Sequence, residues 1–570
     1  MIVRLLLILA FLSAVVSSQG KRVTWRDPTG DGAVNVLVTM VAGASYGVGV
    51  GFARVEIENT CAQTQPVSVL LKPRRFFDGD VQSTRTVVAE PGISRFFLPM
   101  LIPPDQCQLE IVLGGVTFDE RLNYAHSENI VSLFVADRSG RASHGVNVVE
   151  QVQAVYLNGR ATSIPVTSED LPTDWRMLTS FSMIVVDGAT VVASGMTSEV
   201  QDAICRYAFA GGTVVISACE SMPSGSLRDI GVKALNRVLP HGFGYIASVA
   251  AFESDRTGTE AVLAEIPELG SGLWPATSGL FPVQDIEGLG KAPVTVFVVV
   301  ILAFAILVGP INFMILRRRK KPLLALVTVP VLGFGTTVVI LAYGIIHDGF
   351  GVRGVARSCT LLDQGTHEAV SINTSTLFAG MAPSDLTMEP DSLVLSVRAG
   401  VDRADWVDRW SWDANQKRLD GGILPSRTVT PLLTVQQGPV RERLIVRRSG
   451  DTLELLHDGG IEPVGEVVLR DFDGQYWVGK GSVLRRVSNA DGHRRFESLR
   501  GLAAEVSVAE EESIVRPVRL PFGVPRWGQR GTYATRVVAA PWLDDHGVSV
   551  DYDQQDHFVF GRMHAQDFVQ

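Results

Sequence analysis

The sequence predicts a multidomain chain: a β-sandwich, an α/β domain with a parallel sheet, a two-span transmembrane helical hairpin, and a β-rich C-terminal region. Three patterns support this prediction. Short runs of alternating apolar residues fill both ends of the chain, apolar strands alternate with helices in the middle, and two long apolar runs follow. A length of 570 residues is enough for several domains of ordinary size.

Residues 1–20 have the features of a secretory signal peptide. Arg4 supplies a positive start, Leu5 to Val16 form a short apolar core, and small serines follow it. An uncleaved anchor is the alternative, although this core is short for a membrane span. In either case, the chain that follows is expected to begin outside the cytoplasm.

Residues 21–128 predict the β-sandwich. Runs such as AVNVLVTMV and QLEIVLGG alternate apolar with polar residues, and turn-forming residues separate them. Cys61 and Cys107 both fall in this segment, so in an oxidising compartment we expect a disulfide between them. The remaining cysteines lack the paired spacing of a structural zinc site, and we expect no metal there.

Residues 129–285 predict the α/β domain. NIVSLFVAD, SMIVVDG and TVVISA are continuous apolar runs typical of buried parallel strands, and VNVVEQVQAVYL has the pattern of an amphipathic helix. MTSEVQDAICRYAFAGG predicts a second helix, with Thr197 as its N-cap and a Gly-Gly pair closing it. Strands that alternate with helices indicate a parallel sheet covered on both faces.

Three residues would follow the carboxyl ends of these strands, where α/β sheets bind ligands: Asp137, Asp187 and Cys219. Together they are the predicted ligand cleft. Asp137 opens the sequence DRSGR, whereas an integrin-type metal site needs D-x-S-x-S, and Arg141 stands where the second serine would be. A polar loop is therefore the simpler interpretation, and no metal is expected at this edge.

The strand SMIVVDG and the helix ending RYAFAGGTVVISA resemble class I glutamine-amidotransferase-like (flavodoxin-like) domains of uncharacterised bacterial membrane proteins. The membrane entry VGPINFMILRRRKKPLLALVTVP also resembles the transmembrane hairpin of such proteins. The resemblance extends over residues 131–346. It implies an extracytoplasmic α/β domain that precedes the spans and is flanked by β-rich domains.

Amidotransferases of this type place a nucleophilic cysteine on a strand-to-helix elbow and activate it with a later His and Glu. Cys219 takes the elbow position, but its surroundings, SACESMPSG, lack the glycines of a G-x-C-x-G elbow. His241 lacks the His-x-Glu spacing. We therefore expect no catalytic residue, and Cys219 as the nucleophile of a hydrolase or amidotransferase is the alternative.

The hairpin is predicted from two apolar runs, residues 292–316 and 322–346, each long enough to cross a bilayer. The loop between them, residues 317–321, is wholly basic: Arg317, Arg318, Arg319, Lys320 and Lys321. Basic residues close to span ends mark the cytoplasmic side, so this loop is expected in the cytoplasm and both flanking regions outside it.

Inside the spans, Gly309, Pro310 and Pro330 interrupt regular helix and predict kinks. Asn312 is a polar residue at membrane depth and has two interpretations. It either hydrogen-bonds within the hairpin or couples the hairpin to a partner membrane protein.

Residues 348–570 predict an extracytoplasmic β-rich region of one or two sandwich or jelly-roll modules, with DGG, DFDG and NADGH as turns. Three tryptophans, at 406, 410 and 412, stand close together. They fit either a binding platform or packing between sheets, and we favour packing.

The formal net charge of −9 argues against nucleic acid as a partner. No cofactor is implied, and two helices with one polar residue offer no transport pathway. We expect a non-enzymatic protein of the bacterial inner membrane, with its N- and C-terminal domains extracytoplasmic. Its expected role is a scaffold or binding subunit of an envelope or transport-associated complex, and its partners are the lipid bilayer and envelope proteins.

Overall fold

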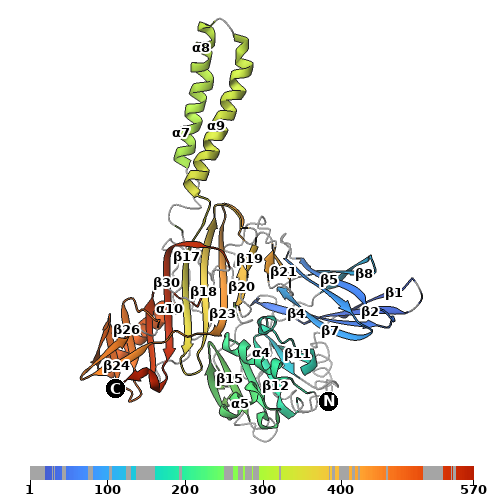
Figure 1. Ribbon diagram of the computed structural model, residues 1–570, viewed down its shortest axis with the longest axis vertical. Helices are drawn as coiled ribbons and strands as arrows, with labels where there is room; N and C mark the ends of the chain where they lie inside the picture. The colour runs from blue at the N-terminus through green and yellow to red at the C-terminus, as the bar shows by residue number, and fades with distance from the viewer. Residues whose placement is uncertain are drawn as a thin grey trace, which may run out of the picture.

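The computed structural model describes residues 20–28, 30, 32–41, 47–74, 81–101, 106–123, 130–135, 161–189, 191, 195–249, 261–262, 264–266, 274–275, 286, 294–319, 322–383, 385–387, 392–396, 410–413, 418–420, 424–456, 460–504, 530–538, 540, 542–543 and 547–569. Over these residues the protein is multidomain and rich in β-sheet, with one pair of apolar helices, as predicted (Figure 1). Apart from Gly20, the predicted signal peptide lies outside the described residues.

The N-terminal strands pack as a sandwich of two antiparallel sheets around a core of Val, Ile and Leu. The first sheet contains β1 (Gly20–Arg26), β2 (Ala33–Val41), β4 (Val50–Asn59) and β7 (Gly92–Leu101). The second contains β6 (Val81–Ala89), β5 (Gln65–Arg74), β8 (Gln106–Leu113) and β9 (Val116–Asn123). A short pair beside them joins β3 (Gly47–Val48) to β16 (Trp274–Pro275).

Three strands from much later in the chain extend the second sheet beyond β6: β21 (Trp410–Asp413), β22 (Arg418–Asp420) and β19 (Asp385–Thr387). β21 runs parallel to β6, with Trp410 opposite Val81. These residues were expected to belong wholly to a separate C-terminal region. Trp410 and Trp412 thus stand on a strand of the sandwich, whereas Trp406 lies outside the described residues.

Cys61 and Cys107 are buried thiols at opposite ends of this sandwich. Cys61 follows Asn59, whose Nδ2 donates to the carbonyl oxygen of Ala89 at 2.9 Å, and Ala89 pairs with the first residue of β5. Cys107 pairs with Pro73 near the other end of β5. That length of strand separates the two ends by about 26 Å, whereas disulfide-bonded Cα atoms lie within about 7 Å of each other. The predicted bridge between them is therefore wrong.

The α/β domain has a six-stranded sheet in the order β11 (Ala161–Val166), β10 (Ile130–Val135), β12 (Met183–Asp187), β13 (Thr213–Ser217), β15 (Gly244–Val249) and β14 (Arg237–His241). All neighbours are parallel except β14, which runs antiparallel to β15 at the edge. Among the described residues, α4 (Ser198–Phe209) and α5 (Ser226–Lys233) accompany the sheet. The predicted N-cap is confirmed, since Thr197 Oγ1 accepts from the backbone N of Val200 at 3.4 Å.

The C-terminal region contributes one twelve-stranded mixed sheet, where one or two separate modules were expected. Its order is β20 (Ser392–Ser396), β23 (Val429–Pro439), β18 (Glu368–Ala379), β17 (Val352–Asp363), β30 (Val550–Arg562), β29 (Thr532–Val537), β26 (Glu466–Arg470), β27 (Tyr476–Lys480), β28 (Val483–Val487), β25 (Thr452–Leu456), β24 (Ile445–Ser449) and β31 (Phe568–Val569).

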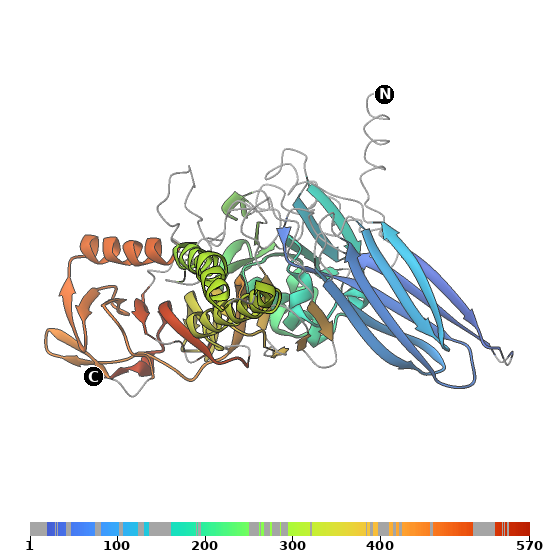
Figure 2. The ribbon, with the colours of Figure 1, turned by 90° about the horizontal axis from the view of Figure 1, so that it is seen from above.

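One helix in this region was not anticipated: α10 (Asn489–Ala504) begins where NADGH was expected to turn. It lies at the end of the body opposite the sandwich (Figure 2). Phe496 is fully buried, and its ring meets that of Phe560 on β30 at a centroid distance of 6.0 Å. Leu499 and Ala503 continue the same apolar stripe at helical spacing, which explains why this polar-looking segment folds as a helix.

A single hydrophobic core joins the three regions. Its buried residues come from the sandwich, the α/β domain and the large sheet, among them Val50, Phe52, Phe181, Ile204, Leu361, Ile372 and Leu433. The regions therefore pack as one body.

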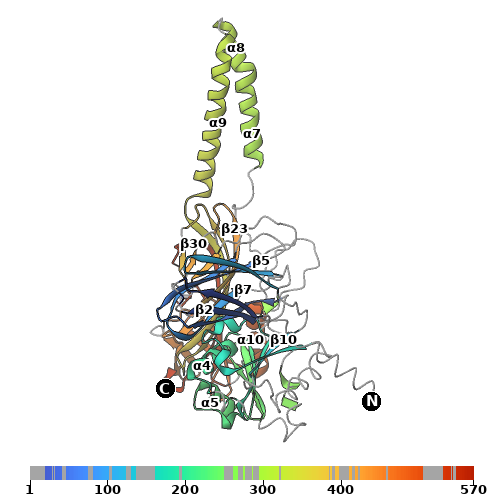
Figure 3. The ribbon, with the colours of Figure 1, turned by 90° about the vertical axis from the view of Figure 1, so that its right-hand side faces the viewer.

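The apolar helices stand clear of this body as a hairpin (Figures 1 and 3). The first arm comprises α7 (Val294–Ile306), a π-helical turn η4 (Leu307–Ile311) and α8 (Asn312–Arg318); the second comprises η5 (Pro322–Leu324) and α9 (Ala325–Asp348). By length and composition, the segments Val298–Arg318 and Ala325–Tyr343 are able to cross a membrane. Arg317, Arg318 and Arg319 are exposed at the tip, and Lys320 and Lys321 lie outside the described residues.

Gly309 and Pro310 occupy the π-helical turn, whereas Pro330 lies inside the continuous helix α9. A proline has no N–H to donate and its ring crowds the preceding turn, so the local change of helical register accommodates Pro310.

Candidate functional site

The carboxyl edge of the parallel sheet is the first candidate site. The chain goes from β10 outward to β11 and then returns to the other side of β10 as β12, so the strand order reverses between β10 and β12. Open α/β sheets bind ligands at such a switch point, outside the carboxyl ends of the strands. Asp187 ends β12 at this point, while Asp137, which follows β10 in sequence, lies outside the described residues.

Asp187 is held in place by its neighbours. It is 1% exposed, and its Oδ1 accepts from Ser217 Oγ at 2.7 Å and from the backbone N of Ala189 at 3.3 Å. Ser217 lies directly opposite it on β13. Gly188 is needed beside it, because a Cβ at that position would lie 2.3 Å from the carbonyl oxygen of Ala218. The backbone is therefore tightly packed at this part of the edge.

Cys219 follows β13 at the turn into the short helix η3 (Cys219–Ser221). The preceding residue, Ala218, has φ 45° and ψ 44°, a left-handed conformation that costs a non-glycine residue about 1–2 kcal/mol. Such a bend places a side chain at a sheet edge, yet Cys219 is 0% exposed. A Cβ at Gly231 of α5 would lie 3.0 Å from its Cβ and 3.7 Å from its Sγ. The thiol therefore packs against α5, away from solvent.

His241 is the only histidine that follows Cys219 within the α/β domain. It lies at the opposite end of the strands from Cys219. It pairs with Gly244, the first residue of β15, whereas Ser217 pairs with Val249, the last. The two ends of β15 are about 16 Å apart. Burial lowers the pKa of His241 to about 4, with Asp363 acting in the opposite direction. The described geometry therefore brings no histidine from this strand to Cys219.

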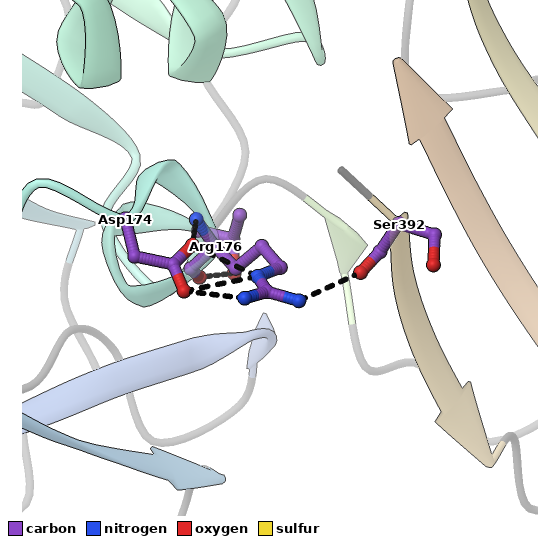
Figure 4. A network of polar contacts seen from close by, with 4 residues as sticks. Asp174, Arg176 and Ser392 are labelled. Atoms are coloured by element: carbon purple, nitrogen blue, oxygen red, sulfur yellow. Dashed lines mark hydrogen bonds and ion pairs between the residues drawn. The ribbon is translucent and has the colours of Figure 1, made fainter. Parts of the chain in front are cut away.

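A three-way junction, which the sequence did not reveal, lies where the regions meet. It is built on the short helix η2 (Trp175–Leu178) and comprises Val50, Asp174, Arg176, Thr179 and Ser392. Arg176 is 4% exposed; its Nε and Nη2 donate to the Asp174 carboxylate at 2.8 and 2.6 Å. Its Nη1 donates to the carbonyl oxygen of Ser392 on β20 at 3.1 Å (Figure 4). This one guanidinium ties the α/β domain to the large sheet.

The same turn also binds the sandwich. Thr179 Oγ1 donates to the carbonyl oxygen of Arg176 at 2.7 Å and accepts from the backbone N of Val50 at 2.9 Å. The backbone N of Ser180 donates in return to the carbonyl oxygen of Val50 at 3.2 Å. Because Val50 begins β4, the strand is anchored to the α/β domain by its own main chain. No sequence motif marks such a contact, since it depends on where distant segments meet.

The polar residue of the hairpin is satisfied within the hairpin. Asn312 Nδ2 donates to Thr328 Oγ1 at 3.0 Å, and the same hydroxyl donates to Asn312 Oδ1 at 3.1 Å. Asn312 is only 8% exposed, whereas most of its apolar neighbours on the hairpin face outward. Of its two interpretations, packing of the hairpin upon itself is the one that these contacts support. Within the described part of the chain, no three His, Cys, Asp or Glu side chains gather as metal ligands.

Comparison with known proteins identifies no family. No family model matches the sequence, and no curated protein matches it. The solved structures that it resembles include a calcium-binding mutant of Bacteroides uniformis β-glucuronidase 2, at 8% identity and a TM-score of 0.12, covering 32% of this chain and 33% of that one. Parabacteroides merdae β-glucuronidase with glycerol in its active site aligns over 83% of this chain and 74% of its own, at 9% identity and a TM-score of 0.16. Similarities this low carry no functional argument.

Proposed function

We propose that this chain is a non-enzymatic, membrane-anchored protein of the bacterial cell envelope, acting as a scaffold or binding subunit of an envelope or transport-associated complex. The hairpin crosses the inner membrane, its basic tip faces the cytoplasm, and the body lies outside. The α/β domain, of the amidotransferase-like type, serves as a binding module in this proposal.

The observation that carries the proposal is the three-way junction. A buried guanidinium that is hydrogen-bonded through all three of its nitrogens and a continuous apolar core fix three regions as one body on a minimal two-helix anchor. A body of this kind presents several surfaces in a fixed relation, which is what a scaffold requires. The hairpin fits an anchor because its polar pair, Asn312 and Thr328, is mutually satisfied.

The amidotransferase-like assignment is supported by strand order. Counted along the chain, the parallel strands stand in the order 2-1-3-4-5, which is that of flavodoxin-like folds. A role in catalysis is not supported by the same domain, because Cys219 is buried against α5 and His241 lies at the far edge of the sheet. We therefore propose that the fold is used for binding.

The test is to purify the tagged full-length protein from its native membrane in mild detergent, as wild type and as Cys219→Ala. We expect both to be recovered in a complex of defined mass with the same stoichiometric envelope partner. Circular dichroism confirms that the variant is folded. A monomeric wild type, together with a hydrolase or amidotransferase activity that Cys219→Ala abolishes, would replace this proposal with the enzymatic one.

A further inference from the structure

The end of the body nearest the hairpin is a rim of joined loops. The backbone N of Gly380 donates to the carbonyl oxygen of Gly351 at 2.9 Å, which links the turn before β17 to the turn after β18. The backbone N of Ala382 donates to Ser426 Oγ at 2.8 Å, which adds the turn before β23. We call these turns, residues 349–351, 380–383 and 424–428, the membrane-proximal rim. Figure 1 shows β17, β18 and β23 ending beneath the hairpin.

Two large apolar side chains protrude from this rim. Phe350 is 66% exposed and Met381 is 61% exposed. Isolated exposed apolar residues are common on protein surfaces, but these two lie on loops that are hydrogen-bonded to each other. Leaving both in water forgoes about 1.5–3 kcal/mol of transfer free energy for each side chain.

Chain length places the rim close to the bilayer. The apolar window of the second arm ends at Tyr343, and α9 ends at Asp348. The apolar residues continue to Ile346 and Phe350 follows α9 by two residues, so two helical and two extended residues place it at most about 10 Å beyond the apolar run. The polar headgroup layer on each side of a bilayer is about 5–8 Å deep. β17 begins at Val352, soon after α9 ends, so no long linker separates the body from the membrane surface here.

The charges around the rim agree with this placement. Arg353, the first charged residue of β17, is ion-paired with Asp553, so the charge that follows Phe350 by three residues is paired. Arg427 is exposed on the rim itself.

We propose that the membrane-proximal rim is a lipid-binding surface, with Phe350 and Met381 reaching into the headgroup layer of the leaflet on the body's side. The hairpin alone would leave the body able to tilt about the base of the hairpin. A second, apolar contact beside it fixes the body upright. This inference rests on the proposed membrane anchor and adds to it a direct contact between body and lipid.

The experiment uses site-specific fluorophores on the full-length protein in phosphatidylethanolamine–phosphatidylglycerol vesicles. All five native cysteines are buried, so new ones are labelled selectively with NBD-maleimide. The reporters are Phe350→Cys and Met381→Cys on the rim, Val338→Cys inside α9, and Val232→Cys on α5 at the far end of the body. Val338 and Val232 are 46% and 44% exposed, which makes them matched sites.

We expect the labels at 350 and 381 to shift to shorter emission wavelength and to be quenched by shallow doxyl-phosphatidylcholine, with the label at 338 quenched by a deep doxyl lipid and that at 232 by neither. Water-like emission from 350 and 381, with 338 still quenched, overturns the rim contact but keeps the anchor. A blue shift without lipid quenching means a protein covers the rim, and also overturns it. Water-like emission at 338 overturns both the anchor and the rim contact.

Discussion

Arg176 is a buried side chain that joins the α/β domain to the large sheet. It is 4% exposed and pairs with Asp174, which remains 26% exposed, so its positive charge would be costly to bury without this carboxylate. A buried arginine of this kind is invisible in one sequence, where it looks like any surface cation. Its role is seen only in the folded protein, where η2 lies beside β20 and the guanidinium bonds to Ser392.

Replacing this side chain tests the junction. We expect Arg176→Met to lower the free energy of unfolding of the full-length protein by about 3 kcal/mol, since removing one member of a buried pair typically costs about 3–5 kcal/mol and Asp174 keeps some solvent. Urea unfolding in detergent micelles measures it. Arg447→Met is the matched control: its pair with Glu454 is exposed on both sides and is worth about 0.2–1 kcal/mol. Equal losses in both variants would contradict a special role for Arg176.

His557 gives the body a predicted sensitivity to acid. It is 4% exposed, its Nδ1 lies 2.7 Å from Ser358 Oγ, and burial lowers its pKa to about 4, with Asp556 raising it and Arg536 lowering it further. The folded protein therefore keeps this ring neutral at pH values where the unfolded chain, with a pKa of about 6.5, binds a proton. The stability that the protein gains from keeping His557 neutral is fully present above a pH of about 6.5. It is lost as the pH falls towards 4.

The expected loss from His557 is about 2 kcal/mol between pH of about 7.5 and about 5. Urea unfolding at the two pH values measures it in the wild type and in His557→Gln, in which the amide is able to keep the hydrogen bond to Ser358. The variant should lose less stability on acidification than the wild type. His241 contributes in the same direction in both proteins, because burial also lowers its pKa. An unchanged acid dependence in His557→Gln would refute the assignment.

Among the elements, those with local patterns were predictable and those defined by distant pairing were not. Each arm of the hairpin, the N-cap at Thr197 and the apolar strand β12 follow from fewer than thirty consecutive residues. Helix α10 was missed because NADGH looks like a turn, while the apolar stripe that makes it a helix begins only at Phe496. β21 was missed because its partner, β6, lies in another part of the chain.

The Asn312–Thr328 pair predicts a measurable coupling between the two hairpin arms. A double-mutant cycle with Asn312→Leu and Thr328→Val should give a coupling energy of about 0.6–2 kcal/mol, the range for interhelical hydrogen bonds in membranes. Unfolding in mixed detergent–SDS micelles measures each variant. In the control cycle, Thr336→Val replaces Thr328→Val, because Thr336 Oγ1 bonds the carbonyl oxygen of Leu332 in its own helix. A coupling no larger than that of the control would refute the pairing.

For the molecule as a whole, the sequence predicted a multidomain, β-rich chain with a pair of apolar helices but not how its parts join. Composition and periodicity are averages over a segment, so they identify a sandwich, a parallel sheet and a hairpin in turn. The junction at Val50, Arg176 and Ser392 depends on three single contacts between those segments, which no average records. Asp187 ends a local apolar run, so its place at the sheet edge could be predicted. The burial of Cys219 against Gly231 depends on a contact with a separate helix and could not be predicted.

The orientation of the molecule is a further prediction. A fluorescent reporter that folds only in the cytoplasm should be active when inserted after Arg319 and inactive after Gln570. An alkaline phosphatase reporter, which requires an oxidising compartment, should give the reverse pattern. The basic tip supplies the physical reason, since Lys and Arg beside a span resist translocation. Phosphatase activity at the tip, or fluorescence at the C-terminus, would contradict the predicted topology.

The pairing of β21 with β6 also affects the order in which the sandwich is completed during synthesis. The second sheet of the sandwich lacks its outer strands until residues 385–420 have been made, and the hairpin lies between them and the end of β9. At 5–20 residues per second, the roughly 290 residues from β9 to β21 take about 15–60 s to synthesise. During that interval, the edge of β6 is open to other strands. The first part of this chain to be made is thus among the last to be completed, and a chaperone that shields an unpaired strand would act here.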